Sequence, residues 1–175
     1  MHNPKQLARV AAMAIAAVAT GAALWGWQSD ARITHAPQAL FKIIDGRQLD
    51  LQQMQGRPVL VTFWATTCEV CRKEMPKLIR LYEDLSPRGF QIVAVAMDYD
   101  PPNLVLELAK QRHIPYPVAL DLDGSVAAAF GKVSLTPTSF LIAPDGRVTL
   151  QKTGELDMRR LRNRVLALLP APARA

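Results

Sequence analysis

The sequence predicts an α/β fold, with a central sheet that is parallel in its first part, ends in an antiparallel hairpin and carries helices on both faces. Residues 58–64 and 91–97 are almost wholly apolar and rich in β-branched side chains, which is typical of strands buried on both faces. Apolar residues at helical spacing follow each of these segments. Pro144-Asp145-Gly146 separates two later strand-like segments and predicts the hairpin. This alternation of strands and helices favours a layered domain.

The first half of the predicted domain contains three strands, one helical turn and a long helix. A strand over 40–44 turns at Asp45-Gly46, a helical turn covers 51–55, and the buried strands span 58–64 and 91–97. Between the buried strands, apolar residues recur every three or four positions from Cys68 to about Leu85, which predicts a helix with one inward face. That face comprises Cys71, Met75, Leu78, Leu81, Tyr82 and Leu85.

The second half contains shorter elements. We expect a helix over 102–112 with Leu104, Val105 and Leu108 facing inward. A strand over 117–120, a short helix over 125–130, the hairpin strands 138–143 and 147–152, and a last helix over 158–169 follow. The inward face of that last helix comprises Met158, Leu161, Val165 and Leu168.

Length and composition exclude several classes of protein. A chain of 175 residues fits one compact domain with a short appendage. With 50% hydrophobic and 21% charged residues, it is neither a disordered chain nor a polytopic membrane protein. Its 2 cysteines exclude a disulfide-stapled scaffold and four-cysteine zinc or iron–sulfur sites. The net charge of +6 is dispersed along the chain, so it predicts solubility and weak attraction to acidic surfaces, and we expect no nucleic-acid partner.

The first part of the chain differs from the rest. Residues 1–9 carry Lys5 and Arg9, and residues 10–27 contain no charge and end in Trp25-Gly26-Trp27. A basic flank, an apolar run and terminal aromatic residues predict a single N-terminal signal anchor, with residues 1–9 cytoplasmic. Cleavage as a signal peptide near Gly21-Ala22-Ala23 is the alternative. Residues 28–37 then form a linker to the domain at 38–170, and 171–175 form a tail.

Cys68-Glu69-Val70-Cys71 carries the chemistry of the predicted domain. Two cysteines at positions i and i+3 at the start of a helix are close enough to form a disulfide. Cys68 lies nearest the helix N-terminus, where free N–H groups and the helix dipole favour a thiolate. We expect Cys68 to attack disulfides and the more shielded Cys71 to resolve the mixed disulfide. An inert disulfide or half of a metal site are the alternatives, and we expect neither a cofactor nor a metal.

Two acidic residues modify this site. Glu74 lies on the same helical face as Cys71, and partial burial would raise its pKa and let it accept the Cys71 proton. The alternative is an exposed acid paired with Lys73 or Lys77. Glu69, between the cysteines, would oppose thiolate formation and make the couple more reducing, while also being a favourable acid in the first helical turn.

The segment 63–76, Phe-Trp-Ala-Thr-Thr-Cys-Glu-Val-Cys-Arg-Lys-Glu-Met-Pro, closely resembles the active-site stretch of the TlpA/ResA/DsbE group of thioredoxin-like proteins. Residues 95–98, 117–121 and 136–142 match later landmarks of that group in the same order. The resemblance covers roughly 38–169. It implies a thioredoxin-like fold with an N-terminal β extension and a central βα insert near 98–120, behind the single N-terminal transmembrane helix.

The resemblance also implies roles for individual residues. Thr136-Pro137 is expected to be a cis bond beside the cysteines, in a loop that binds the substrate, and Glu74 takes the place of the group's active-site glutamate. Trp64 is a further candidate for substrate contact, with packing beside the site as the alternative. Thr67 departs from the tryptophan that many relatives have before the first cysteine, so a flat aromatic surface beside Cys68, which would bear on partner choice, is lost.

Members of the group are extracytoplasmic reductants of selected proteins, often apocytochrome c or copper-site assembly factors. The resemblance therefore implies a periplasmic domain at the inner membrane, with protein disulfides as substrates and a DsbD/CcdA-like membrane thiol transporter as electron donor.

Two other functions compete with this interpretation. A peroxiredoxin-like peroxidase would need Thr three residues and Pro seven residues before its reactive cysteine, where this chain has Ala65 and Val61. A copper chaperone would use both thiolates as ligands, with His113 as the candidate third ligand. The arginines at positions 159, 160, 162 and 164 are interpreted as the solvated side of an amphipathic helix rather than a membrane or nucleic-acid surface.

Overall fold

The computed structural model describes residues 32–170, so the predicted anchor over 10–27 and the tail over 171–175 lie outside the described residues. Between residues 32 and 170, no helix combines the length and the apolar character that crossing a membrane requires. The strands are β1 (Leu40–Ile43), β2 (Gln48–Asp50), β3 (Val59–Trp64), β4 (Gln91–Ala96), β5 (Val118–Leu120), β6 (Thr138–Ile142) and β7 (Val148–Thr153). The helices are η1 (Leu51–Met54), α2 (Glu69–Leu85), η2 (Ser86–Arg88), α3 (Pro102–Gln111), α4 (Ser125–Ala129) and α5 (Met158–Leu168).

One seven-stranded sheet forms the centre of the described region, in the order β2-β1-β5-β4-β3-β6-β7. Strands β3, β4 and β5 run parallel, and β6 and β7 add the antiparallel hairpin on one side. Strands β1 and β2 extend the other side, with β1 antiparallel to β5. The predicted α/β sheet, its N-terminal β extension and its closing hairpin are therefore confirmed.

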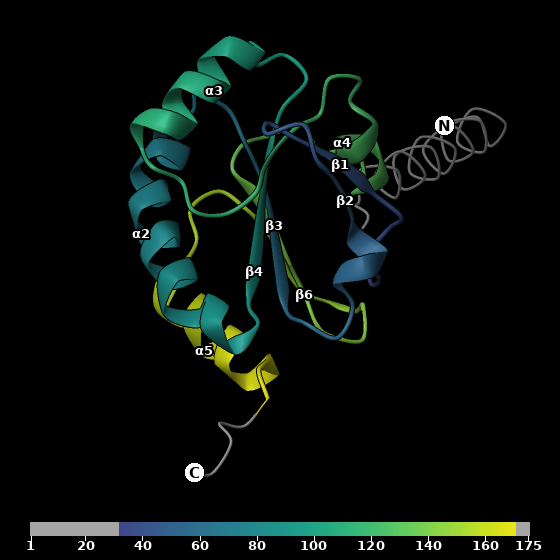
Figure 1. The fold of residues 1–175 in the computed structure, drawn as a ribbon. Coiled ribbons are helices and arrows are strands. Elements are labelled where there is room, and N and C mark those ends of the chain that lie inside the picture. The colour runs from purple at the N-terminus through teal and green to yellow at the C-terminus, as the bar shows by residue number, and fades with distance from the viewer. Residues whose placement is uncertain (1–31, 171–175) are drawn as a thin grey trace, which may run out of the picture. The chain divides into compact units, whose positions relative to one another are not determined.

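Helices cover both faces of the sheet (Figure 1). The apolar residues of α2, α3 and α5 pack in one core cluster with Leu60 of β3 and Ile92 of β4. Short elements, η1 and α4, pack in a second cluster with Val61 and Val93, the next residues along the same strands. Successive strand residues point to opposite faces, and burial of β3 on both sides explains its continuous apolar run.

Two details differ from the sequence-based expectation. Strand β2 was not predicted, because its three residues are only partly buried and carry no apolar pattern. The inward orientation of Leu104 was wrong, since its side chain is 42% exposed while Val105 is fully buried. The buried face of α3 instead continues through Ala109. Residues four apart share a helical face, so packing of Val105 and Ala109 turns Leu104 toward solvent.

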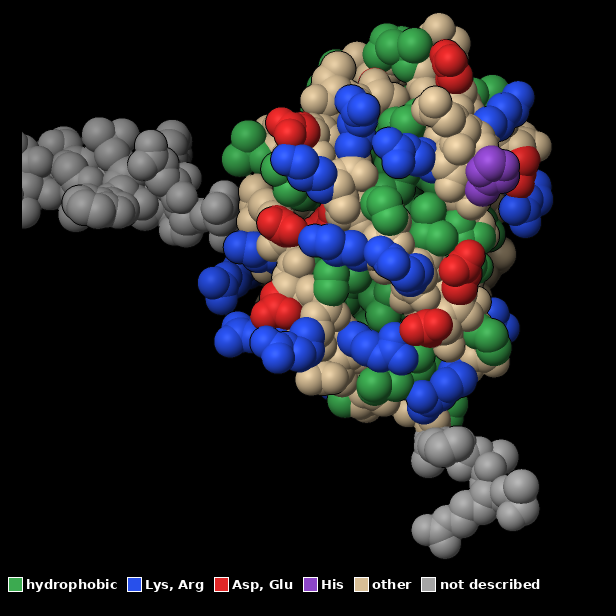
Figure 2. Space-filling model, turned by 90° about the vertical axis from the view of Figure 1, so that its left-hand side faces the viewer, with side chains coloured by type: hydrophobic (Ala, Val, Ile, Leu, Met, Phe, Trp, Pro, Cys, Tyr) green, Lys and Arg blue, Asp and Glu red, His purple; other side chains and the backbone are tan. Residues whose placement is uncertain are grey.

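The face that α2, α3 and α5 present to solvent carries many lysines and arginines interspersed with acids (Figure 2). The four arginines of α5 are exposed, as expected for the solvated side of an amphipathic helix. Arg162 pairs with Asp84 of α2 at 2.7 Å, and Arg164 donates a hydrogen bond to the Thr149 carbonyl at 2.7 Å. These contacts tie α5 to α2 and to β7.

Candidate active site

The two cysteines lie where β3 gives way to α2, and they form a disulfide. Their Cα atoms are 5.3 Å apart. Cys68 is the N-cap of α2, with extended backbone angles, and its Sγ accepts a hydrogen bond of 3.2 Å from the Cys71 N–H. The Cys71 N–H has no acceptor within the helix and points at the first sulfur instead. This sulfur lies at the helix N-terminus, where the helix dipole favours a negative charge.

Burial distinguishes the two sulfurs. Cys68 is half-buried, whereas Cys71, one turn further into the helix, is 5% exposed and belongs to the core cluster. An incoming disulfide can therefore reach Cys68, while Cys71 is accessible only to a group already bound at Cys68. Accessible thiolates at helix N-termini are the reactive class of protein cysteine.

Glu74 lies fully inside the protein, one helical turn after Cys71. It is 1% exposed, and its Oε1 accepts a hydrogen bond of 2.5 Å from the N–H of Leu156, in the loop before α5. Burial raises the pKa of Glu74, and the charge of Glu155 adds to that rise, while the Leu156 hydrogen bond and Lys77 oppose it. Lys77 pairs with Glu155 instead, at 3.0 Å, so Glu74 is not the exposed, lysine-paired acid of the alternative interpretation.

The loop before β6 adds a buried proline to the same site. The Thr136–Pro137 peptide bond is cis, Pro137 is buried and Thr136 is half-buried. The Pro137 carbonyl accepts a hydrogen bond of 2.8 Å from the N–H of Gly154, and Thr138 Oγ1 donates to the Leu135 carbonyl at 2.8 Å. Pro137, Cys71, Glu74 and Trp64 line one small cavity.

Glu69 and Thr67 lie on the solvent side of the motif. Both side chains are exposed, and Glu69 forms an ion pair of 2.6 Å with Lys73 across one helical turn. The hydrogen bond and the charge of Lys73 lower the pKa of Glu69, so this residue is ionised over the physiological range. Any influence of its charge on Cys68 acts through solvent and is screened by salt.

Asp100 is a site residue that the sequence reasoning missed. It is 3% exposed in the loop after β4, and its carboxylate accepts 2.7 Å and 2.5 Å hydrogen bonds from the N–H and hydroxyl of Thr66. These bonds fix the loop that leads into Cys68. The signal was present, because adjacent parallel strands bring their following loops to the same edge of the sheet.

Within residues 32–170, no group of three or more His, Cys, Asp and Glu side chains is placed to hold a metal ion. His113 follows α3 and has a positive φ of 50°.

Comparison with known proteins agrees with this geometry. The Redoxin family pattern matches residues 34–166. Thiol-disulfide oxidoreductase ResA from Bacillus subtilis is 34% identical over 131 residues, which cover 75% of this chain and 72% of ResA. ResA from Bacillus thuringiensis subsp. konkukian is 32% identical over 136 residues, or 77% of each chain. The crystal structure of a thioredoxin-family thiol:disulfide interchange protein from Chlorobium tepidum superposes with a TM-score of 0.72 at 28% identity, covering 81% of this chain and 100% of that one.

Proposed function

The chain belongs to the Redoxin family, as a thiol-disulfide oxidoreductase of the TlpA/ResA/DsbE-like thioredoxin group, and from this premise we propose that it reduces disulfides of selected partner proteins. The observation that carries the proposal is the unequal placement of the two sulfurs. Cys68 is accessible at the helix N-terminus, and Cys71 is buried behind it. That arrangement assigns attack to Cys68 and resolution to Cys71.

The exchange proceeds in two steps that balance. In the dithiol form, the Cys68 thiolate attacks a partner disulfide, so that a Cys68–partner disulfide forms and one partner thiolate leaves. The Cys71 thiolate then attacks Cys68 Sγ, which forms the Cys68–Cys71 disulfide and releases the second partner thiolate. The partner gains two electrons and the domain loses two.

Glu74 supplies the base for the second step. Cys71 must lose its proton before it attacks, and its burial keeps bulk solvent away from that proton. Glu74 lies on the same face of α2 and lines the same cavity as Cys71. The pKa of Glu74 is raised above that of an ordinary carboxyl, toward neutral pH. A general base transfers protons most efficiently when its pKa lies near the working pH.

Acidic residues around the cysteines support the reducing direction. A negative charge near a thiolate disfavours the reduced, ionised state and so favours the disulfide. Glu69 lies between the cysteines, and Glu74 shares a cavity with Cys71. A couple whose disulfide is stabilised in this way donates electrons more readily.

The partners and the location are part of the proposal. The apolar run at 10–27 would anchor the chain in the inner membrane, or be cleaved to release it, with the catalytic domain in the periplasm. A DsbD/CcdA-like transporter would keep the cysteines reduced, and the substrates would be disulfides of proteins in cytochrome c maturation or copper-site assembly. These assignments are supported by the resemblance of residues 63–76 to the TlpA/ResA/DsbE group.

The test is to trap the partners covalently. In membranes that contain the full chain, Cys71→Ala should accumulate mixed disulfides through Cys68, because attack proceeds and resolution does not. Cys68→Ala should trap none and should lose disulfide reduction. Partners trapped on Cys68→Ala but not on Cys71→Ala would reverse the assigned roles.

The direction of electron flow needs a second measurement. Alkylation of the wild-type chain in intact cells should find Cys68 and Cys71 mostly as thiols at steady state, since a donor keeps a reductant reduced. A chain that rests mostly as the disulfide would instead be an oxidant.

A further inference from the structure

The indole of Trp64 buries a hydrogen-bond donor that has no acceptor among residues 32–170. Trp64 ends β3 and is 3% exposed, and its Nε1 is the one buried side-chain nitrogen or oxygen in this range without a partner. Thr62, on the same face of β3, is satisfied by Ser139 at 2.9 Å. Buried polar groups in proteins are almost always bonded to protein or to ordered water. The unpaired N–H therefore points to a small ligand that accepts a hydrogen bond.

A small cavity that Trp64 lines can hold such a ligand. Its volume is about 20 Å³. The side chains in its wall with a polar group or a cysteine sulfur are Thr62, Trp64, Cys71, Glu74 and Tyr116, and Pro137 forms another part of it. A water molecule needs roughly 10–15 Å³ and two to four polar partners. The cavity meets the volume requirement, and the residues that line it include an indole, a carboxyl and a phenol that could serve as polar partners.

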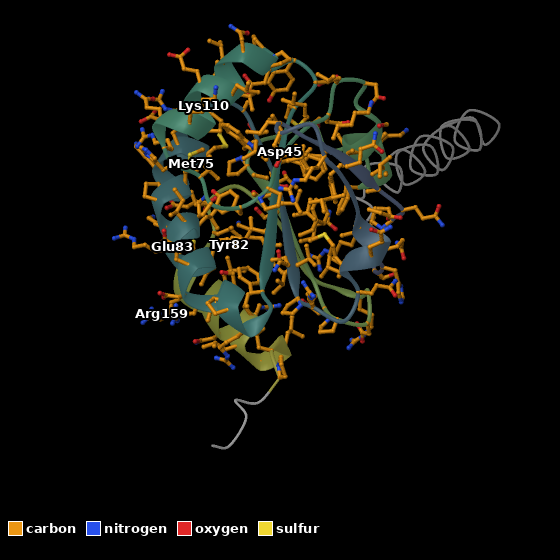
Figure 3. The ribbon with its side chains drawn as sticks, viewed as in Figure 1. Asp45, Met75, Tyr82, Glu83, Lys110 and Arg159 are labelled. Atoms are coloured by element: carbon orange, nitrogen blue, oxygen red, sulfur yellow. A yellow bond between two sulfur atoms is a disulfide. The ribbon has the colours of Figure 1, made fainter. Side chains whose placement is uncertain are left out.

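Tyr116 connects this cavity to a larger one. Its side chain is 5% exposed and packs edge-to-face on Tyr82, with ring centroids 5.7 Å apart. Tyr116 and Tyr82 also line a groove of about 580 Å³ that reaches Asp45. Figure 3 shows Tyr82 on the inner side of α2, turned toward the sheet, while Glu83 points away from it. Tyr116 is therefore common to the cavity at Cys71 and to a groove that opens to solvent.

Chemically, Tyr116 is suited to pass protons without losing its own. Burial and the neighbouring charge of Glu74 raise the pKa of Tyr116, so its hydroxyl stays protonated and can donate and accept in one chain of hydrogen bonds. Because Tyr116 and Glu74 line the same cavity, Tyr116 offers a route by which a carboxyl that is 1% exposed could exchange protons with solvent.

We propose that the cavity binds one ordered water, held by the Trp64 indole N–H, that carries the proton between Cys71 and Glu74, and that the Tyr116 hydroxyl connects Glu74 to the groove. This proposal rests on the proposed function, because it specifies how Glu74 serves as the base for Cys71. Trp64 is a positioning residue in this scheme, because its indole holds the water, whereas Tyr116 relays the proton that Glu74 releases.

The proton steps balance. The water accepts the Cys71 thiol proton while it gives one of its own to the Glu74 carboxylate, which leaves a thiolate, a water and a neutral Glu74. The thiolate then attacks Cys68 in the mixed disulfide. Glu74 afterwards releases its proton through the Tyr116 hydroxyl to water in the groove. The charges that act on Glu74 in this cycle are those of Lys77, which lowers its pKa, and Glu155, which raises it.

The water can be detected directly on the oxidised, full-length chain with ¹⁵N-labelled tryptophan. The chain has 3 tryptophans, and Trp64→Phe identifies the indole signal of Trp64 by its loss. A cross-relaxation peak between water and the Trp64 indole N–H is expected, as for a long-lived internal water. It should persist in Tyr116→Phe, which excludes transfer from an exchanging tyrosine hydroxyl. A Trp64 indole N–H without that peak would overturn the proposal.

Kinetics test whether the water carries the proton. A mixed disulfide of Cys68 with a chromogenic thiol releases the chromophore when Cys71 attacks, so its release rate reports the resolving step. Trp64→Phe removes the donor that holds the water and should slow release roughly tenfold near neutral pH, less than the 10²–10⁴-fold contribution typical of a general base, because Glu74 is kept. Tyr116→Phe should leave this first release unchanged and slow repeated turnover, because Tyr116 acts only when Glu74 gives up its proton. Tyr82→Phe, which removes a hydroxyl on the groove side only, is the matched control for Tyr116→Phe and should leave both rates unchanged.

The two levels of the mechanism can fail separately. In Trp64→Phe the resolving step should slow and its solvent isotope effect should change, while attack by Cys68 on the chromogenic disulfide keeps its rate. If Glu74→Gln slows resolution but Trp64→Phe leaves its rate, pH profile and isotope effect unaltered, the water route is wrong and Glu74 remains the base. If Tyr116→Phe does not slow repeated turnover, Tyr116 is not the exit for the proton. If Glu74→Gln itself has no effect, the role of Glu74 in the proposed function is wrong.

Discussion

Strand β3 presents two unlike surfaces to the two sides of the sheet. On one side its residues Val61 and Phe63 enter an apolar interior, where Phe63 meets the rings of Phe130 and Phe140. On the other side, residues of the same strand face α2 and meet buried polar groups: Thr62 with Ser139, the unpaired indole of Trp64, and Glu74 beneath Cys71. Both sides of the sheet carry an apolar core cluster, but the alternation of side chains along β3 places the redox site on only one of them.

The largest effect is expected on the apolar side of β3, where Val61 and Phe63 are buried. The Phe130 ring lies 5.4 Å from Phe63 and 5.0 Å from Phe140, and all three side chains are buried. Phe130→Ala should lower the free energy of unfolding by about 3–5 kcal/mol, because it removes buried contacts and leaves a cavity. Urea denaturation measures this loss. Under conditions where the variant is folded, chromophore release from Cys68 should match the wild type, and a slower release would mean that the two sides are not independent.

Glu74→Gln should show the opposite behaviour. The amide oxygen of glutamine can still accept the Leu156 hydrogen bond, but it cannot take a proton from Cys71. We expect the resolving step to slow by roughly 10²-fold, at the lower end of the range for lost general-base catalysis. Stopped-flow release of the chromophore from Cys68 measures the change, and a rate within twofold of wild type would remove Glu74 from the reaction.

The pH dependence of the free energy of unfolding should also reveal the burial of Glu74. Its pKa is raised above the ordinary 4.5 in the folded state, so the neutral carboxyl is favoured on folding. The resulting stability is fully present below pH 4.5 and is lost as pH rises through the raised value. Glu74→Gln should therefore gain stability relative to wild type as pH increases from 4 to 8. If the free energies of unfolding of wild type and Glu74→Gln differ by the same amount at every pH, burial does not raise the pKa of Glu74.

The apolar side could be predicted from the sequence more completely than the functional side. The runs at 58–64 and 91–97 specify buried strands whatever packs on them, and Cys68 and Cys71 follow such a run directly. Burial of Glu74 depends on Leu156, which is 82 residues away in the chain. The orientation of Leu104 likewise depended on which α3 residues the core accepted. Local spacing cannot settle contacts that tertiary packing chooses.

The Thr66–Asp100 contact joins the loop after β3 to the loop after β4 and so lies at the end of the strands rather than on either side of β3. Thr66→Val removes the hydroxyl that donates to Asp100 and keeps the backbone N–H bond. A hydrogen bond to a charged group contributes about 1.5–3 kcal/mol, so unfolding should become easier by roughly 1–2 kcal/mol with one of two bonds left. Attack by Cys68 should slow as well, because this loop positions it, whereas resolution by Cys71 should not. Equal slowing of both steps would show that the loop acts on the whole site.

The smallest effect is expected at the solvent side of the motif, where Glu69 and Lys73 form an exposed pair. Glu69→Gln removes a negative charge beside Cys68 and should shift the equilibrium with glutathione toward the thiols by a few-fold, since the thiolate is then less disfavoured. Lys73→Met removes the neutralising partner of Glu69 and should shift it the other way. Both shifts should shrink as salt rises from 0.05 to 0.5 M, because exposed charges are screened, whereas the effects of Phe130 and Glu74 should not. Shifts of the same sign in the two variants would mean that Glu69 acts through helix stability rather than through its charge on Cys68.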